Sequence, residues 1–189
     1  LETPSVRLAG LHCHIGSQIF ALHSFREAID VMIQFIKRIN EEYDYEIEGL
    51  DLGGGLGIAY VKEEEPPTIE SFAKLTCTAV KELCAHYGVK EPRIAVEPGR
   101  SIAATPGVTL YTVGILKTLP GIRNIVAVDG GMSDNIRTAL YGAEYESVIA
   151  NKANQPRTKV VTLVGKHCES GDAVAADASI QNPDLGDTV

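Results

Sequence analysis

The sequence lacks any apolar run close to the ~20 residues that a membrane-spanning helix requires, and it shows no signal-peptide pattern. Basic residues are also in short supply: 17 Lys and Arg stand against 25 Asp and Glu, which gives a net charge of -8. General affinity for nucleic acids needs clustered positive charge, so this balance argues against it. The hydrophobic share of 44% is that of an ordinary globular protein.

Cysteine is scarce, with four in 189 residues. Cys77 and Cys84 fall seven positions apart on an expected helix, where helical rise separates their Cα atoms by about 10 Å. This separation is too large for a disulfide bond between them. We therefore expect reduced thiols and a cytoplasmic location.

The first half of the chain alternates between strand-like and helix-like segments. In the first helix-like segment, Val31, Phe35, Ile36 and Ile39 belong to one apolar face. Alternation of this kind predicts parallel strands joined by helical crossovers. We expect strands at 6–14, 47–52 and 93–97, and a first helix at 22–43. A second helix is expected to be capped by Thr68, to run to about Tyr87 and to end at Gly88.

Polar or glycine residues follow each expected strand. Ligands of parallel α/β folds bind at the carboxyl ends of strands, so these residues should address one place. Glycines at 53, 54, 55 and 57 suit a backbone that turns sharply or approaches a ligand closely, and their N–H groups can bind a phosphate. A flexible turn is the simpler alternative. The three groups are His12 and His14, Gly53–Gly55, and Glu97–Arg100.

The second half changes character after Pro106. Segments 108–119, 122–128 and 158–164 are rich in strand-forming residues and have no helix of useful length between them, which predicts an antiparallel β domain. We therefore expect one domain at 1–105 and an incomplete second at 106–189. If the first belongs to a closed (β/α)8 barrel, which takes about 250 residues, the missing part lies upstream. The chain begins without Met close to strand-like sequence and stops without a polar tail, so we expect it to be a fragment of a longer protein.

Several motifs carry candidate chemistry. His12 and His14 share a face, but no carboxylate or thiolate partner is evident nearby, so no metal site is expected. Glu97 and Arg100 form either a surface ion pair or an acid that holds a ring nitrogen protonated beside an anion-binding Arg. Cys168, beside Glu169, is either an inert thiol or a proton donor.

Five segments resemble, in order and spacing, the diaminopimelate decarboxylase family, within the alanine-racemase-like (fold type III) pyridoxal-phosphate enzymes. Ornithine and arginine decarboxylases share the glycine cluster and the Glu-Pro-Gly-Arg turn. The His-Ile-Gly-Ser-Gln, Asp-Asn-Ile-Arg and Cys-Glu-Ser-Gly-Asp forms favour the diaminopimelate branch. The segments are 10–18, 51–57, 97–101, 129–141 and 168–172.

This resemblance implies part of a pyridoxal-phosphate-binding (β/α)8 TIM barrel, a C-terminal β domain, and an active site shared between the subunits of a homodimer. The activity implied is decarboxylation of meso-2,6-diaminopimelate to L-lysine and carbon dioxide. The cofactor, pyridoxal 5'-phosphate, would be bound by His14, Ser17, Gly54, Gly55, Glu97, Gly99 and Arg100. Substrate would be bound by Arg100, Arg137, Tyr141 and Glu169, with His14 and Cys168 as catalytic residues.

Two family features have no counterpart in the chain. The Schiff-base lysine is expected upstream of residue 1, and a tyrosine near the phosphate is expected beyond Val189, so we expect the chain alone to be inactive. An ornithine-, arginine- or carboxynorspermidine-type decarboxylase, or a non-catalytic relative, remains an alternative. Arg137 favours diaminopimelate over these other substrates, because a distal substrate carboxylate needs a cation whereas a diamine tail needs acids.

Overall fold

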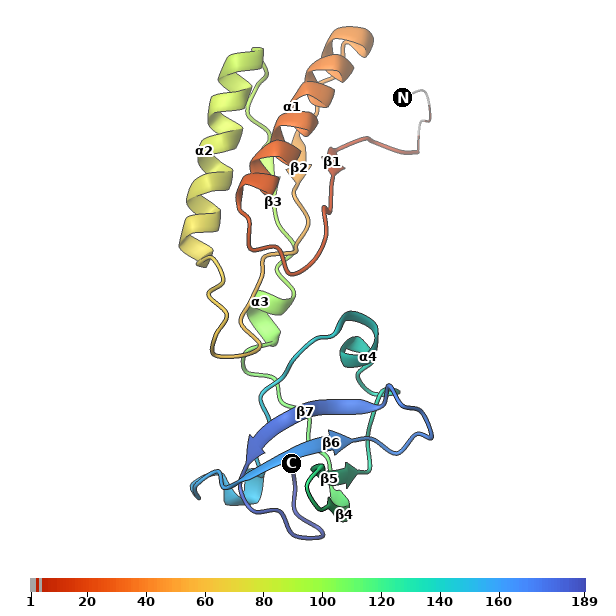
Figure 1. Ribbon diagram of the computed structural model, residues 1–189. Coiled ribbons are helices and arrows are strands. Elements are labelled where there is room, and N and C mark those ends of the chain that lie inside the picture. The colour runs from red at the N-terminus through yellow and green to blue at the C-terminus, as the bar shows by residue number, and fades with distance from the viewer. Residues whose placement is uncertain (1–2, 4) are drawn as a thin grey trace. The chain divides into compact units, whose positions relative to one another are not determined.

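The computed structural model describes residue 3 and residues 5–189 (Figure 1). The chain forms two compact units that divide between Gly107 and Val108, close to the boundary expected after residue 105. Each unit has its own sheet and its own hydrophobic core. The residues after Gly107 therefore build a second core instead of extending the first.

The first unit contains a parallel sheet in which β2 lies between β1 and β3. Two long helices connect successive strands, as the alternating sequence pattern predicted. Each strand is three residues long, shorter than the sequence pattern predicted. The elements are β1 (Gly10–His12), α1 (His23–Tyr43), β2 (Gly49–Asp51), α2 (Ile69–Tyr87) and β3 (Arg93–Ala95).

Helix α2 begins and ends at the signals read from the sequence. The Thr68 side chain accepts a hydrogen bond from the Ser71 N–H at 3.0 Å, which satisfies one of the free donors at the start of the helix. At the other end Gly88 adopts a left-handed conformation with φ 68°, and its N–H donates to the Cys84 carbonyl.

The core of the first unit lies between α1, α2 and the sheet, where Leu50 and Val80 are buried. The apolar face predicted for α1 was partly wrong, since Val31 is 64% exposed. Apolar residues occur on more than one side of α1, so periodicity alone does not select the buried side. The buried residues of α1 are Phe25, Ile29, Ile33, Ile36 and Ile39. Within the described part of the chain, no helix has the length and apolar character that crossing a membrane requires.

The carboxyl ends of the three strands lie in register. His12 pairs with Asp51, and Asp51 pairs with Ala95. Because the strands are parallel, the loops that follow them leave the sheet at the same edge. This arrangement brings the three groups of polar and glycine residues together, as the sequence predicted.

The second unit is a four-stranded mixed sheet, so the β domain predicted for residues 106–189 is confirmed, but the prediction that it is antiparallel was wrong for one of the three strand pairs. The β4–β5 and β6–β7 pairs are antiparallel, whereas β5 and β6 run parallel. A parallel pair needs a long crossover, and the segment between β5 and β6 supplies one with two short helical turns that the sequence pattern missed. The elements are β4 (Val113–Leu119), β5 (Arg123–Val128), α4 (Arg137–Tyr141), a 3-10 turn (Ala150–Lys152), β6 (Lys159–Val164) and β7 (Ala173–Ile180).

An ionic cluster ties the end of the chain to the 3-10 turn. The Lys152 ammonium contacts Asp184 at 2.6 Å and Asp187 at 2.5 Å, and the Asp187 side chain is only 8% exposed. Burial acts to raise the pKa of Asp187, but hydrogen bonds from Lys152, Asn151 and the Asp184 N–H outweigh it, so the pKa is lowered. Asp187 is therefore a carboxylate that folding stabilises in its charged form.

We expect Asp187→Asn to lower the free energy of unfolding by about 1 kcal/mol at neutral pH, because the amide loses the charge-assisted bond from Lys152. Since the pKa of Asp187 is lower in the folded state, its stabilisation is present above the unfolded pKa and is lost as pH falls through the folded pKa. Urea unfolding should therefore show a difference in the free energy of unfolding between the unsubstituted protein and Asp187→Asn at neutral pH, and this difference should disappear in acid. The exposed Asp177→Asn should leave stability unchanged, and a difference that persists in acid would contradict the prediction.

Candidate active site

The loop after β1 is fastened to the loop after β2. The Cys13 N–H donates to the Asp51 carbonyl at 2.9 Å, which extends the strand pairing by one residue. One residue further, the ring Nδ1 of His14 accepts a hydrogen bond from the Gly54 N–H at 3.2 Å. His14 is thus held over the glycine loop by a ring nitrogen that must lack a proton to accept this bond.

Burial, and then the nearby Asp51 carboxylate, raise the pKa of the Cys13 thiol. A thiol with a raised pKa stays protonated near neutral pH and is a poor nucleophile. Cys13 packs against the core of the first unit, so its position is structural. All four cysteines of the chain are free thiols, in agreement with the expected absence of a disulfide between Cys77 and Cys84.

The glycines after β2 are required by close backbone contacts. Gly55 has φ 102°, a conformation that strongly favours glycine, and a Cβ there would overlap the carbonyl oxygen of Gly16. A Cβ at Gly54 would overlap the carbonyl oxygen of Glu97. The glycine loop therefore lies pressed between the loops that follow β1 and β3.

The side chain of Gln18 connects the loop after β1 to the loop after β2, although the sequence analysis assigned Gln18 no role. Its Nε2 donates to the Ile58 carbonyl at 2.6 Å, and its Oε1 accepts from the Ile58 N–H at 3.3 Å. The backbone of Ile19 adds two bonds, donating to the Gly55 carbonyl at 2.9 Å and accepting from the Gly57 N–H at 3.0 Å. The side-chain amide of Gln18, the last residue of the His-Ile-Gly-Ser-Gln segment, was the feature of the sequence that could have indicated this role.

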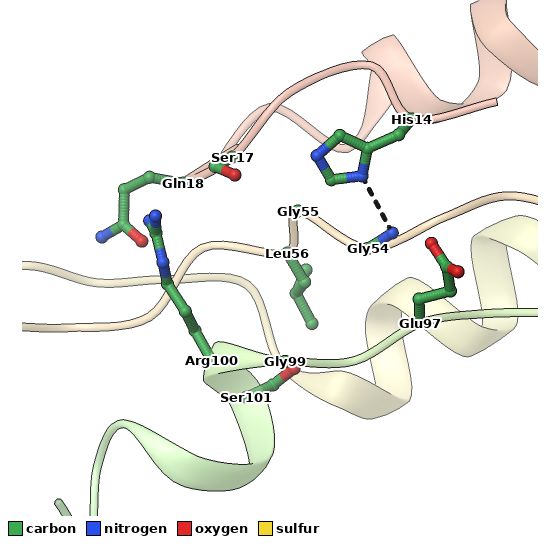
Figure 2. Close-up of a pocket in the computed structure, with 10 residues that line it drawn as sticks. All are labelled: His14, Ser17, Gln18, Gly54, Gly55, Leu56, Glu97, Gly99, Arg100 and Ser101. Atoms are coloured by element: carbon green, nitrogen blue, oxygen red, sulfur yellow. Dashed lines mark hydrogen bonds between the residues drawn. The ribbon is translucent and has the colours of Figure 1, made fainter.

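Arg100 starts a short helix, α3 (Arg100–Ala103), directly after the Glu-Pro-Gly turn. Its Nη1 is buried, and among the described residues no acceptor forms a hydrogen bond with it. A buried guanidinium N–H without a partner is costly, and an anion placed beside it would remove that cost. Figure 2 shows the Arg100 side chain extending from α3 toward Gln18.

These loops enclose a pocket of about 230 Å³ (Figure 2). All seven residues that the resemblance named for cofactor binding line it, and they come from the ends of three strands that are distant in sequence. Three further lining residues, Gln18, Leu56 and Ser101, were not predicted, although each directly follows a predicted residue in the sequence. The ten residues are His14, Ser17, Gln18, Gly54, Gly55, Leu56, Glu97, Gly99, Arg100 and Ser101.

His12 has two carboxylates close by, so our reason for excluding a metal site beside it was wrong. Ligating atoms of His12, Asp51 and Glu97 all lie within 4.8 Å of one another. The His12 Nε2 and the Glu97 Oε2 are hydrogen-bonded at 3.2 Å. This cluster could not be predicted from the sequence, because its members lie at or just after the ends of three different strands.

The second unit holds the other predicted residues. Arg137 and Tyr141 lie at the two ends of α4, with the guanidinium 5.6 Å from the Tyr141 ring centroid. The Arg137 Nε also donates to the Tyr145 hydroxyl at 3.1 Å. Tyr145 was not predicted, and no motif pointed to it. These contacts orient a cation next to an exposed aromatic ring.

Cys168 and Glu169 lie on an exposed turn that is organised by Asp172. The Asp172 carboxylate is buried and accepts hydrogen bonds from the Met132 N–H at 2.6 Å and the His167 N–H at 2.7 Å. It thereby joins the turn to the loop after β5, which leads into α4. A Cβ at Gly171 would lie 3.8 Å from that of Ala139, so the two predicted substrate motifs are neighbours in this unit.

The family follows from a sequence comparison. The sequence-family model described as "Pyridoxal-dependent decarboxylase, pyridoxal binding domain" matches residues 1–104, more than half of the chain. The chain belongs to the pyridoxal-dependent decarboxylases. The predicted cofactor, pyridoxal phosphate, agrees with this family, and the matched segment contains the whole pocket of Figure 2.

Relatives of the chain include diaminopimelate decarboxylases. The chain is 43% identical over 187 residues to "Diaminopimelate decarboxylase" of Bacillus subtilis, and 44% identical over 179 residues to that of Staphylococcus aureus. These alignments cover 99% and 95% of this chain but 43% and 41% of the relatives. The chain thus spans about two fifths of the length of these relatives.

Solved structures of decarboxylases share the fold. Diaminopimelate decarboxylase from M. jannaschii, solved in complex with L-lysine, matches with a TM-score of 0.83 and 34% identity. The match covers 95% of this chain and 40% of that one. The chain therefore shares its fold with solved pyridoxal-dependent decarboxylases, in agreement with the predicted resemblance.

We expect Gly55→Ala to lower the free energy of unfolding by about 2 kcal/mol or more, because alanine is strained at φ 102° and its Cβ overlaps the Gly16 carbonyl. Gly49→Ala is the matched control, since a Cβ there meets its nearest atom at an ordinary 3.5 Å. Urea unfolding of both variants measures the difference. Equal stability of the two variants would show that Gly55 is not constrained by close packing.

Proposed function

We propose that the gene product containing this chain decarboxylates meso-2,6-diaminopimelate to L-lysine and carbon dioxide, the last step of lysine biosynthesis. The observation that carries the proposal is the pocket of Figure 2, in which an acid, a histidine and an arginine with a buried Nη1 that lacks a partner among the described residues lie around a glycine loop. The family match supplies the cofactor, and relatives named diaminopimelate decarboxylase supply the substrate.

The residues present fit the phosphate of the cofactor. The buried Arg100 Nη1 has no protein acceptor among the described residues, and a phosphate oxygen would satisfy it with a charge-assisted bond. Ser17 contributes a hydroxyl to the same pocket. Gly54, Gly55 and Gly99 allow a ligand to approach the backbone closely, which a side chain at these positions would prevent.

Glu97 and His14 would act on the pyridine ring. The Glu97 carboxylate would hold a proton at the ring nitrogen, and the His14 imidazole would stack on the ring face. When bound, the cofactor supplies a protonated ring that accepts the electron pair released as carbon dioxide leaves. The role of Glu97 is therefore to keep the ring in its electron-accepting form.

The second unit would handle the substrate. The Arg137 guanidinium suits the distal carboxylate of diaminopimelate, with Tyr141 beside it, and Glu169 suits an amino group. The Cys168 thiol would deliver a proton to Cα after carbon dioxide has left. In this proposal Cys168 and Glu169 act on the site of a second copy, so the enzyme is a homodimer.

The finer architecture belongs to the same proposal. Residues 1–105 would be the later part of a (β/α)8 barrel, and the lysine that binds the cofactor would lie on an earlier strand, upstream of residue 1. A cytoplasmic location, expected from the reduced cysteines, stays a prediction. No catalysis is expected from the chain alone, because it has no lysine in a matching motif.

Substrate assays test the function. With pyridoxal phosphate present, the gene product should form L-lysine from meso-diaminopimelate with a kcat/KM roughly 100-fold above that for L-ornithine, because ornithine has no distal carboxylate for Arg137 to bind. A preference for ornithine or arginine would replace the proposed substrate. Cofactor binding without turnover of any of these amino acids would indicate a non-catalytic relative.

The two arginines should separate cofactor binding from substrate binding. Arg100→Gln should weaken pyridoxal phosphate binding roughly 10- to 100-fold, since it removes a charge-assisted bond to the phosphate. Arg137→Gln should raise KM for meso-diaminopimelate by a similar factor and leave cofactor affinity unchanged. Absorbance titration and steady-state kinetics measure these quantities. Equal loss of cofactor affinity in both variants would contradict the assignment.

A further inference from the structure

The carboxylate of Glu97 is held by a residue for which the proposed mechanism has no use. The side chain of His12 reaches it from the end of β1, with Nε2 and Oε2 3.2 Å apart. Among the residues that the structure describes, no other side chain forms a hydrogen bond with Glu97. An ionised carboxylate only accepts hydrogen bonds, so the proton of this contact must be carried by Nε2 of His12.

The backbone around this contact leaves little freedom. His12 lies directly opposite Asp51 in the sheet, and Asp51 lies opposite Ala95, two residues before Glu97. The Glu97 N–H donates to the Gly53 carbonyl at 2.8 Å, and the Gly53 N–H donates to Asp51 Oδ1 at 2.9 Å. Glu97 is thus held by hydrogen bonds at both ends: its backbone N–H bonds to the glycine loop, and its carboxylate bonds to His12.

We propose that His12 is a positioning residue that fixes the orientation of the Glu97 carboxylate toward the pyridine nitrogen of the cofactor. This proposal rests on the proposed function. Both Glu97 oxygens can rotate about the side-chain bonds, and only a carboxylate held in one orientation meets a ring nitrogen at hydrogen-bond distance. The bond from His12 occupies Oε2 and leaves Oε1 for the ring.

A set of substitutions at position 12 isolates the hydrogen bond. His12→Gln places an amide nitrogen near the position of Nε2 and keeps a donor, whereas His12→Asn is too short to reach it, and His12→Phe keeps the ring shape without a donor. His23→Phe is the matched control, because His23 is exposed at the start of α1 and lies outside the pocket. All variants are made in the complete gene product.

We expect His12→Phe and His12→Asn to lower kcat roughly 10- to 100-fold with little change in KM, and His12→Gln to retain most of it. The absorption spectrum of the bound cofactor, which reports the protonation of its ring, should change in the first two variants only. In a Glu97→Gln background, His12→Phe should have no further effect, because the coupled pair is already broken.

Other outcomes would overturn the proposal. Unchanged kcat and an unchanged spectrum in His12→Phe would show that Glu97 needs no support from His12. Equal losses in His12→Gln and His12→Asn would show that the hydrogen bond is not what matters, and this pair decides the question if His12→Phe does not fold. Failure of the unsubstituted protein to bind pyridoxal phosphate would reject the proposed function itself, independently of His12.

Discussion

The glycine loop after β2 is the constraint on which the candidate site depends. Its backbone lies so close to the loops after β1 and β3 that a Cβ at Gly54 or Gly55 would overlap a neighbouring carbonyl oxygen. Hydrogen bonds fix this contact on both sides, from Ile19 to the Gly55 carbonyl and from Glu97 to the Gly53 carbonyl. A backbone without side chains lets three strand ends converge closely enough for residues distant in sequence to share a pocket of about 230 Å³.

In the second unit, a buried carboxylate holds two loops close together. Two loops that carry predicted substrate residues meet at Asp172, whose carboxylate accepts backbone hydrogen bonds from both. Gly131 and Gly165 lie against this carboxylate, where any side chain would collide with it. In both units, then, the predicted site residues lie on loops whose backbones are held in place by hydrogen bonds and close packing.

Local patterns predicted much of this fold. The order of strands and helices in the first unit follows from hydrophobic periodicity, and the ends of α2 follow from Thr68 and Gly88. The mixed direction of the second sheet could not be predicted, because α4 is too short to produce a periodic signal and the parallel pairing depends on contacts distant in sequence. The resemblance supplied seven of the ten residues that line the pocket, whereas the contact between His12 and Glu97 depends on strand register.

The central claim is that Arg100 and the glycine loop bind the phosphate of pyridoxal phosphate. The most direct test is a crystal structure of the complete gene product grown with that cofactor. We expect the phosphate to accept a hydrogen bond from the buried Nη1 of Arg100 and to lie against Ser17 and Gly55, with the ring nitrogen facing Glu97. A phosphate bound elsewhere, with the Arg100 guanidinium still unpartnered, would contradict the claim.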